Sequence, residues 1–109
     1  MKHDPNIVIS DEVLAKIAVT AAKEVDGVAK LVPLPLDLAR LPKKKNDLRF
    51  VKITQNQAAE LTVALALRLH AAAQVTAVAG RVQRAVKDAL ESMTERTIAR
   101  VNVRIQGVD

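Results

Sequence analysis

The sequence contains no cysteine, no tryptophan and no tyrosine, and Phe50 is its single aromatic residue. The lack of cysteine excludes disulfide bonds, thiolate metal sites and cysteine nucleophiles together. Since apolar residues still make up 50% of the chain, the core must be built from valine, leucine, isoleucine and alanine. A chain this apolar is not intrinsically disordered, and 109 residues suffice for one core. We therefore expect residues 1–109 to form a single domain.

A formal net charge of +5 favours contact with an acidic partner, nucleic acid or an anionic membrane surface, and selects none of the three. Solubility alone explains a charge of this size equally well. The first residues, Met1 to Pro5, lack the apolar core of a signal peptide, so we expect a cytoplasmic protein.

The first third of the sequence predicts a helix flanked by two short β-like runs. Ser10 is suited to cap a helix, because its hydroxyl can accept a hydrogen bond from an unpaired backbone N–H. Apolar residues then recur at helical spacing and Gly27 follows the last of them, which predicts a helix from Asp11 to Val25. The β-like runs are Asn6–Ile9 and Val28–Val32.

Residues 33–47 are predicted to be a loop that contains prolines and lysines. Proline lacks a backbone N–H and restricts the residue before it, so Pro33, Pro35 and Pro42 interrupt any helix or strand. The leucines between these prolines either fold back over the edge of the core or form an exposed segment that binds a partner. Lys43–Lys45 are expected to be a solvated loop tip, and three lysines would provide only a weak membrane anchor.

Two strands joined as a hairpin are predicted in the middle of the chain. Leu48–Thr54 is β-like, and Glu60–His70 alternates strictly between large apolar residues and small or polar ones. Residues 55–57 supply the turn between them. The window Leu61–Gly80 carries one charge and is long enough to cross a bilayer. Because its spacing changes from a strand period to a helix period, we interpret it as a strand followed by a helix.

A long helix and a last strand complete the predicted fold. The helix begins near Gln74, contains Gly80 as a mark of close packing against the sheet, and has a predicted buried stripe of Val75, Val78, Val82, Val86, Ala89 and Met93. In the strand Ile98–Gln106, the residues predicted to face inward are Ala99, Val101, Val103 and Ile105. These patterns predict an α+β fold: a two-layer sandwich with two helices packed on one face of a mainly antiparallel sheet of three to four strands.

No grouping of residues in the sequence points to catalysis. The two histidines, His3 and His70, lie at the chain start and at a strand end, and Ser10 is already explained as a helix cap. The carboxylates are scattered, the three glycines form no phosphate-binding loop, and the spacing shows no metal-ligand cluster. We therefore predict a protein that is not an enzyme, with no catalytic residues, no metal site and no cofactor.

The predicted open face of the sheet is basic and forms a candidate partner interface. Its residues are Arg68, His70, Arg100, Asn102 and Arg104, with Lys52 beside them. Sheet-based RNA-binding modules use such a face, but they stack bases on aromatic rings, and Phe50 is the single ring in this sequence. A face that is solvated or covered by a protein subunit is therefore the preferred interpretation, and a nucleic-acid-binding module is the alternative.

Short segments also occur in a characteristic order between about Val8 and Val108. They are Val25-Asp26-Gly27-Val28, Val82-Gln83, Val86-Lys87, Met93-Thr94, Val101-Asn102-Val103 and Gly107-Val108. This series resembles the alkaline shock protein family, the envelope stress response proteins found mainly in Gram-positive bacteria. The resemblance covers nearly the whole chain, although no single segment in it is specific.

The resemblance implies an abundant, non-enzymatic cytoplasmic protein that serves cell-envelope homeostasis as a scaffold or adaptor. It also implies self-association into a homo-oligomer, and recruitment to the inner face of the membrane by an anchored member of the same family. The chain departs from the family at Leu69–Ala72, where an aromatic residue and a glycine are common, and at Glu95, where glycine is usual. Since a left-handed Glu95 would cost about 1–2 kcal/mol, we expect the turn there to be re-formed.

Overall fold

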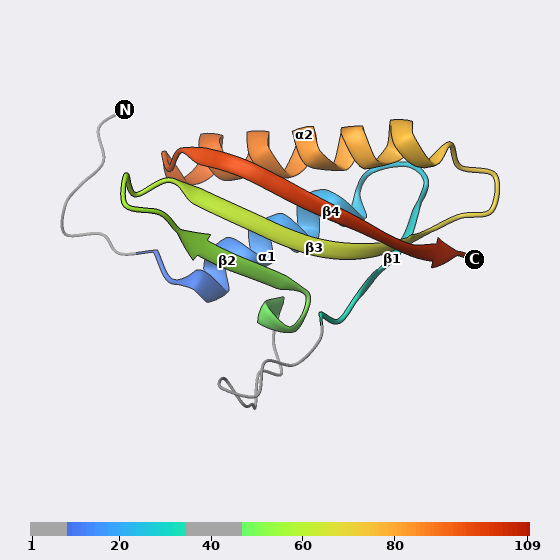
Figure 1. Ribbon diagram of the computed structural model, residues 1–109, viewed down its shortest axis with the longest axis horizontal. Helices are drawn as coiled ribbons and strands as arrows, with labels where there is room; N and C mark the ends of the chain where they lie inside the picture. The colour runs from blue at the N-terminus through green and yellow to red at the C-terminus, as the bar shows by residue number, and fades with distance from the viewer. Residues whose placement is uncertain (1–8, 35–46) are drawn as a thin grey trace.

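The computed structural model describes residues 9–34 and 47–109, which form two α-helices, one short 3-10 helix and four strands (Figure 1). In chain order these are α1 (Asp11–Lys23), β1 (Val28–Val32), η2 (Asp47–Arg49), β2 (Val51–Gln55), β3 (Leu61–Leu69), α2 (Val75–Thr94) and β4 (Ile98–Val108). The predicted strand at Asn6–Ile9, apart from its last residue, and the loop leucines and lysines at 35–46 lie outside the described residues.

Strand β3 is the centre of the sheet. On one side of it, β2 pairs with residues 61–65 and β1 pairs with residues 66–69, both antiparallel. On its other side, β4 pairs with β3 in parallel along its whole length. The predicted α+β fold with a four-stranded, mainly antiparallel sheet is therefore confirmed. The parallel pair was not predicted, and α2 is the crossover that joins its two strands.

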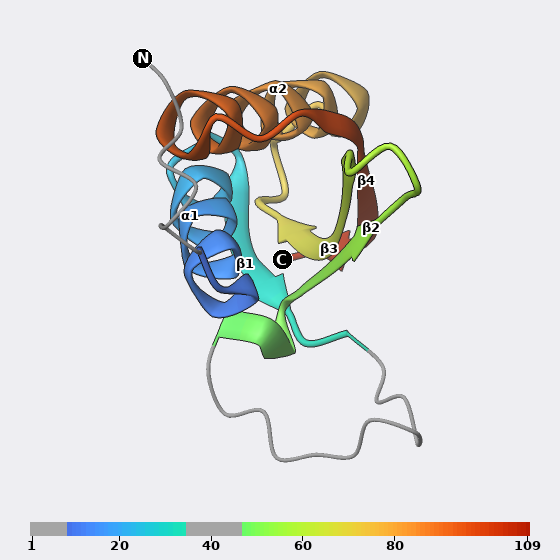
Figure 2. The same ribbon diagram turned by 90° about the vertical axis from the view of Figure 1, so that its left-hand side faces the viewer.

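Both helices pack against the same face of the sheet. Helix α1 contacts β1 and β2, helix α2 contacts β4, and the two helices contact each other. Figure 2 shows α1 on the opposite side of the molecule from β2 and β3. The core between these layers is aliphatic, and its largest fully buried side chains are Leu14, Leu65, Leu67, Leu69, Leu90, Val51, Val63, Val78, Val82 and Val86.

Ser10 accounts for the start of α1, and Gly27 accounts for the turn that follows the helix. The Ser10 hydroxyl accepts a hydrogen bond from the Val13 N–H at 3.3 Å, which confirms the predicted N-cap. After the helix, Gly27 adopts a φ of 101°, a conformation that residues with a side chain rarely take. A Cβ atom at this position would also lie 2.7 Å from Val78 Cγ2. Gly27 therefore lets the chain turn into β1 while α2 packs closely over the turn.

The buried stripe of α2 is turned relative to the prediction. Val78, Val82 and Val86 are buried as predicted, but the stripe continues through Leu90 and Thr94. Ala89 is half-buried, and two residues predicted to be buried are exposed: Val75 by 44% and Met93 by 66%. The observed stripe continues from Val86 in steps of four residues, to Leu90 and then Thr94. The predicted stripe instead took a step of three residues from Val86 to Ala89, which led it to Met93. The predictions for Val75 and Met93 were therefore wrong.

Helix α2 ends at Glu95, which adopts the left-handed conformation with φ 58° and ψ 20°. Its N–H donates to the Glu91 carbonyl at 3.2 Å, as in a left-handed C-cap. The expectation that the turn would be re-formed to avoid this conformation was wrong. The adjoining contacts hold the turn in place: the Thr94 hydroxyl bonds the Leu90 carbonyl, and a Glu91 carboxylate oxygen accepts from the Ile98 N–H at 3.1 Å.

Strand β4 contains an extra residue near its start. Leu61 pairs with Ile98 and Thr62 with Arg100, so Ala99 has no partner on β3. Ile98 is buried and Ala99 is exposed, which corrects the predicted inward position of Ala99. From Val101 onward the predicted inward set is confirmed, since Val101 is buried and Val103 and Ile105 pack against the core.

Two smaller predictions also need correction. The strand predicted from Leu48 begins at Val51, because residues 47–49 form η2. A Cβ atom built on Gly80 would meet nothing within 4 Å, so this glycine does not mark close packing against the sheet.

Candidate functional site: the open face of the sheet

The sheet face opposite the helices is turned toward the viewer in Figure 1, where α1 passes behind the strands. Side chains alternate across a strand, and those of β3 that point into the core are Leu61, Val63, Leu65, Leu67 and Leu69. The intervening residues of β3 and their register partners form the other face. We call this set the open sheet face: Lys30, Val32, Lys52, Thr54, Thr62, Ala64, Ala66, Arg68, Arg100, Asn102, Arg104 and Gly107.

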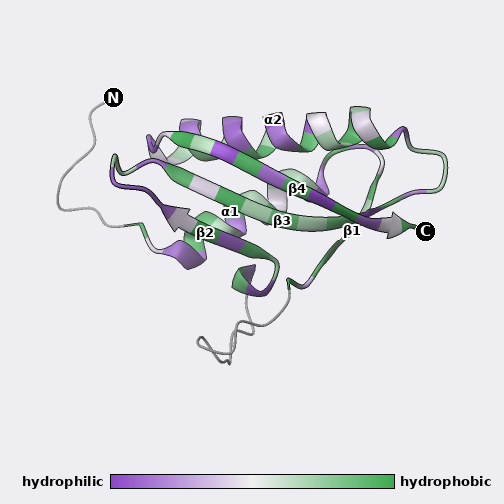
Figure 3. Ribbon diagram, in the orientation of Figure 1, coloured by the Kyte–Doolittle hydropathy of each residue, from purple (hydrophilic) through white to green (hydrophobic). Residues whose placement is uncertain are grey.

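The register places cations on both sides of a row of small residues. Along the middle of the open sheet face run Thr62, Ala64 and Ala66 of β3. On the β4 side, Arg100 lies opposite Thr62 and Arg104 lies opposite Ala66. The alternation of hydrophilic and hydrophobic residues along β4 is visible in Figure 3.

The opposite side of that row carries lysines from two different strands. Lys52 of β2 lies opposite Ala64, and Lys30 of β1 lies opposite Arg68. The cations therefore alternate from one side to the other along β3. At about 3.3 Å per residue, the part of β3 from Thr62 to Arg68, along which these cations lie, is about 20 Å long.

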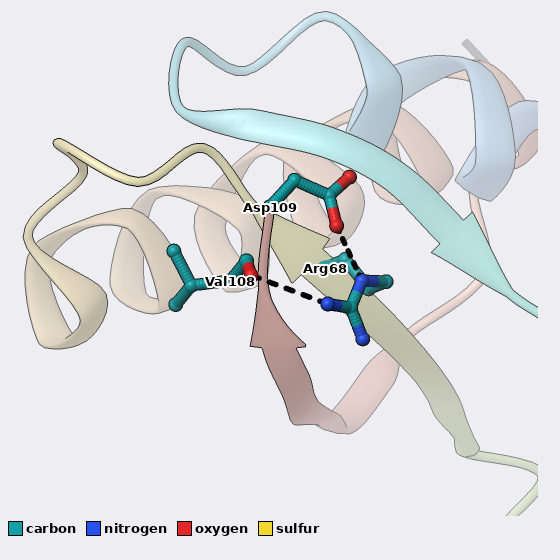
Figure 4. Close-up of polar contacts among 3 residues, drawn as sticks. All are labelled: Arg68, Val108 and Asp109. Carbon is teal, nitrogen blue, oxygen red and sulfur yellow. Dashed lines mark hydrogen bonds and ion pairs between the residues drawn. The ribbon is translucent and has the colours of Figure 1, made fainter.

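Arg68 is bound within the protein, as Figure 4 shows. Its Nε donates to Asp109 Oδ1 at 2.5 Å, and its Nη2 donates to the Val108 carbonyl at 3.2 Å. A Cβ atom on Gly107 would lie 2.7 Å from Arg68 Nη1, so the guanidinium lies directly over this glycine. The hydrogen bond from Arg68 lowers the pKa of Asp109 below its ordinary value, with smaller contributions from Lys30 and His70. Both side chains remain partly exposed.

The other cations of the open sheet face have no such partner. Lys30, Lys52, Arg100 and Arg104 make no ion pair and no side-chain hydrogen bond with any other residue that the structure describes. All four are exposed, and no residue of the open sheet face is acidic. This face is therefore a surface of unpaired positive charge that can attract an anionic group.

The structure brings most of the predicted interface residues together. Arg68, Arg100, Asn102 and Arg104 share the open sheet face. His70 lies just beyond the end of β3, where its backbone N–H donates to the Gly27 carbonyl at 2.9 Å. Lys30 belongs to the face but was not predicted. Alternation alone would have placed Lys30 on the same side as the buried Val28. The register shift between Val28 and Lys30, which the sequence does not reveal, turns Lys30 to the open sheet face.

Phe50 does not lie on this face. It packs against the core and lines a hollow of about 280 Å³ together with residues of α1 and β1, including Val19, Lys23 and Leu31. The Arg49 guanidinium lies over its ring, 4.8 Å from the centroid. The only aromatic ring in the sequence is therefore not available to stack a base on the open sheet face.

A metal cluster and a membrane-spanning helix are both lacking in the described ranges, 9–34 and 47–109. Within them, no three histidine, aspartate or glutamate side chains gather to hold a metal ion. Within the same ranges, no helix has the length and apolar character needed to span a membrane. The apolar window Leu61–Gly80 is divided between β3, a turn and the start of α2, as its change of period predicted.

Comparison with known proteins gives one family and one fold. The profile of the alkaline shock protein 23 family, described by a cell envelope-related function, matches residues 1–109. Two solved structures of variants of the MamM C-terminal domain each align at a TM-score of 0.54 with 15% identity, over 90% of this chain and 98% of theirs. A third, a copper form of the same domain, aligns equally well. A search of curated proteins found no match. At this identity the structural likeness concerns the fold alone.

Proposed function

The chain belongs to the alkaline shock protein 23 family, whose function is cell envelope-related, and from this premise we propose that it is a non-enzymatic adaptor that binds another protein. In this proposal the protein is cytoplasmic, self-associates, and is recruited to the inner face of the membrane by an anchored partner. The open sheet face is the surface through which it binds.

One observation carries this proposal: Lys30, Lys52, Arg100 and Arg104 are exposed together and unpaired among the described residues. Four like charges on one face repel each other, so an arrangement of this kind weakens the fold slightly unless a partner neutralises it. Charged residues on edge strands also prevent unwanted pairing of strands, and this role applies here too, because β1, β2 and β4 each pair only with β3 in the described sheet. Edge protection does not require the charges to share one face, whereas these four cations all lie on the face opposite the helices.

Fractionation of native cells tests the adaptor role. The tagged protein is isolated from the membrane and soluble fractions, and co-purifying proteins are identified after crosslinking. We expect part of the protein in the membrane fraction, released when the co-purifying membrane protein is deleted. Recovery solely as a free monomer in the soluble fraction, with no crosslinked protein, would contradict the proposal.

Nucleic-acid binding is the second candidate, and the same basic face favours it. It is the weaker candidate because the ring of Phe50 packs on the core and not on this face. Retention of the protein on RNA at physiological salt, lost when Arg100 and Arg104 are reversed in charge, would favour RNA over a protein partner.

A further inference from the structure

The open sheet face has a shape as well as a charge. Its middle row, Thr62, Ala64 and Ala66, consists of short side chains, whereas the cations on its two sides are long. Ala66 is fully buried although it lies on the face opposite the helices. Its register partners on either side are Val32 and Arg104, whose side chains flank it. A partner on this face would therefore touch Thr62 and Ala64 of the central row, while Ala66 is already covered by its neighbours.

The cations alternate along those sides. Arg100 and Arg104 are on β4, and Lys52 and Lys30 are on β2 and β1. Successive cations on opposite sides are offset by about two residues, or about 6.6 Å, along β3. A partner that runs along β3 would meet positive charge alternately on its two flanks. Asn102 and Thr54 add uncharged hydrogen-bonding groups between these charges.

The protein also shows how this face binds a carboxylate. Asp109 lies at the end of the face, where its carboxylate accepts a hydrogen bond from Arg68 Nε. The carbonyl of the preceding residue, Val108, accepts a second hydrogen bond from Arg68 Nη2. A carboxylate with an adjacent backbone carbonyl is what an acidic polypeptide carries at each acidic residue. Arg68 is already occupied, so the cations available to a partner are Lys30, Lys52, Arg100 and Arg104.

We propose that the open sheet face binds an acidic polypeptide segment of a partner protein, which lies along β3 over Thr62, Ala64 and Ala66 with carboxylates directed to both flanks. The inference rests on the proposed adaptor function and names the chemistry of its partner. The small central row lets the partner's main chain come close to the sheet. A helix of about 13–15 residues would span the available 20 Å.

Two other anionic partners fit the face less well. RNA binding to an open sheet relies on stacking, and Phe50 is not on this face. A membrane-binding surface gains strength from apolar side chains that enter the lipid. The large exposed apolar residues of the described chain are Val13, Val75, Met93 and Val108, and none of them belongs to the open sheet face.

The experiment measures the affinity of the whole chain for three probes across a range of salt concentrations. The probes are a fluorescent peptide of alternating glutamate and alanine, about 15 residues long, an oligouridylate of equal charge, and vesicles of phosphatidylglycerol and phosphatidylethanolamine. The test variant is Arg100→Glu with Arg104→Glu. The matched control is Arg81→Glu with Arg84→Glu on the exposed surface of α2, which changes the net charge equally. Circular dichroism confirms that each variant is folded.

We expect the peptide to bind most tightly of the three probes. The variant Arg100→Glu with Arg104→Glu should lower the affinity for the peptide by about tenfold, since two attractive charge pairs become repulsive. The helix variant should weaken peptide binding by no more than about twofold, because those charges are distant from β3. Equal losses in the two variants, or tighter binding of the oligouridylate or the vesicles than of the peptide, would overturn the proposal.

A variant with unchanged charge makes the test sharper. Ala64→Trp puts a bulky ring in the central row. If the peptide lies along β3, this ring should lower the affinity for the peptide by about threefold or more. The same ring would strengthen RNA binding, because bases stack on it. Unchanged or tighter peptide binding in this variant would contradict the placement along β3. The adaptor function would survive that result if native cells still yield a crosslinked membrane protein, so the two failures are distinguishable.

Discussion

Arg68 and Asp109 lie 41 residues apart in the chain and are joined by a hydrogen bond of 2.5 Å from Nε to Oδ1. The backbone reinforces this contact, because the Asp109 N–H donates to the Leu69 carbonyl at 2.7 Å. The end of β4 is thereby fixed to the end of β3. Because this contact occupies Arg68, the cations of the open sheet face that are available to a partner are Lys30, Lys52, Arg100 and Arg104.

The carboxyl of Asp109 should titrate below its ordinary pKa of 3.8, because the hydrogen bond from Arg68 favours the charged form. A carboxyl whose pKa is depressed by folding contributes stability above its unfolded pKa, and this contribution is lost as the pH falls through the folded pKa. We therefore expect the contact between Asp109 and Arg68 to be intact at neutral pH and to break only in acid. Carbon-detected NMR titration of the Asp109 carboxyl measures this, and Arg68→Gln should return its pKa toward the ordinary value. An unchanged titration in Arg68→Gln would contradict the assignment.

Gly27→Ala should destabilise the protein strongly, because it combines a φ of 101° with a Cβ placed 2.7 Å from Val78 Cγ2. The left-handed conformation costs about 1–2 kcal/mol and the displaced contact adds about as much again. Gly80→Ala is the matched control. Its Cβ would meet nothing within 4 Å, so the helix propensity of alanine should raise stability by up to about 1 kcal/mol. Thermal unfolding of both variants should give shifts of opposite sign.

Glu95→Gly should stabilise the protein. Glu95 has φ 58°, and glycine adopts this conformation without the steric cost. Part of the gain is offset by the greater freedom of glycine in the unfolded chain, so we expect a net increase of about 0.5–1 kcal/mol in the free energy of unfolding.

Glu24→Gly is the control for that substitution. Glu24 caps α1 in the right-handed conformation, with φ −83°, so glycine brings only its entropic cost there. Chemical denaturation should show Glu24→Gly lowering stability by about 0.5–1 kcal/mol. A loss of stability in both variants would mean that Glu95 contributes more through its side chain than its backbone conformation costs.

Periodic patterns predicted the elements of this fold well, because burial of one face imposes a period that the sequence displays directly. The alternation from Leu61 to Leu69 placed β3 within one residue at each end. What periodicity does not contain is the relation between elements. The parallel pairing of β3 with β4 depends on how α2 packs across the sheet. The unpaired Ala99, which reverses the expected positions of Ile98 and Ala99, depends on that pairing.

The candidate site was predicted as a set of residues but not as a surface. Alternation alone places Arg100, Asn102 and Arg104 on the outer side of their strand. Their neighbours on that side, Lys52 beyond Ala64 and Lys30 beside Arg68, follow only from the register. Arg68 was predicted to belong to the interface, and the structure shows it bound to Asp109, a contact between distant residues that no local pattern signals.

Site-specific photo-crosslinking in the native host tests the central claim most directly. A photoreactive residue replaces Asn102 in the open sheet face, and in a separate strain it replaces Arg84 on α2; both positions are exposed. The account predicts a covalent adduct with a protein from position 102, mapped to an acidic segment of that protein, and no such adduct from position 84. Adducts to the same proteins from both positions, or adducts from position 102 to RNA or lipid alone, would contradict it.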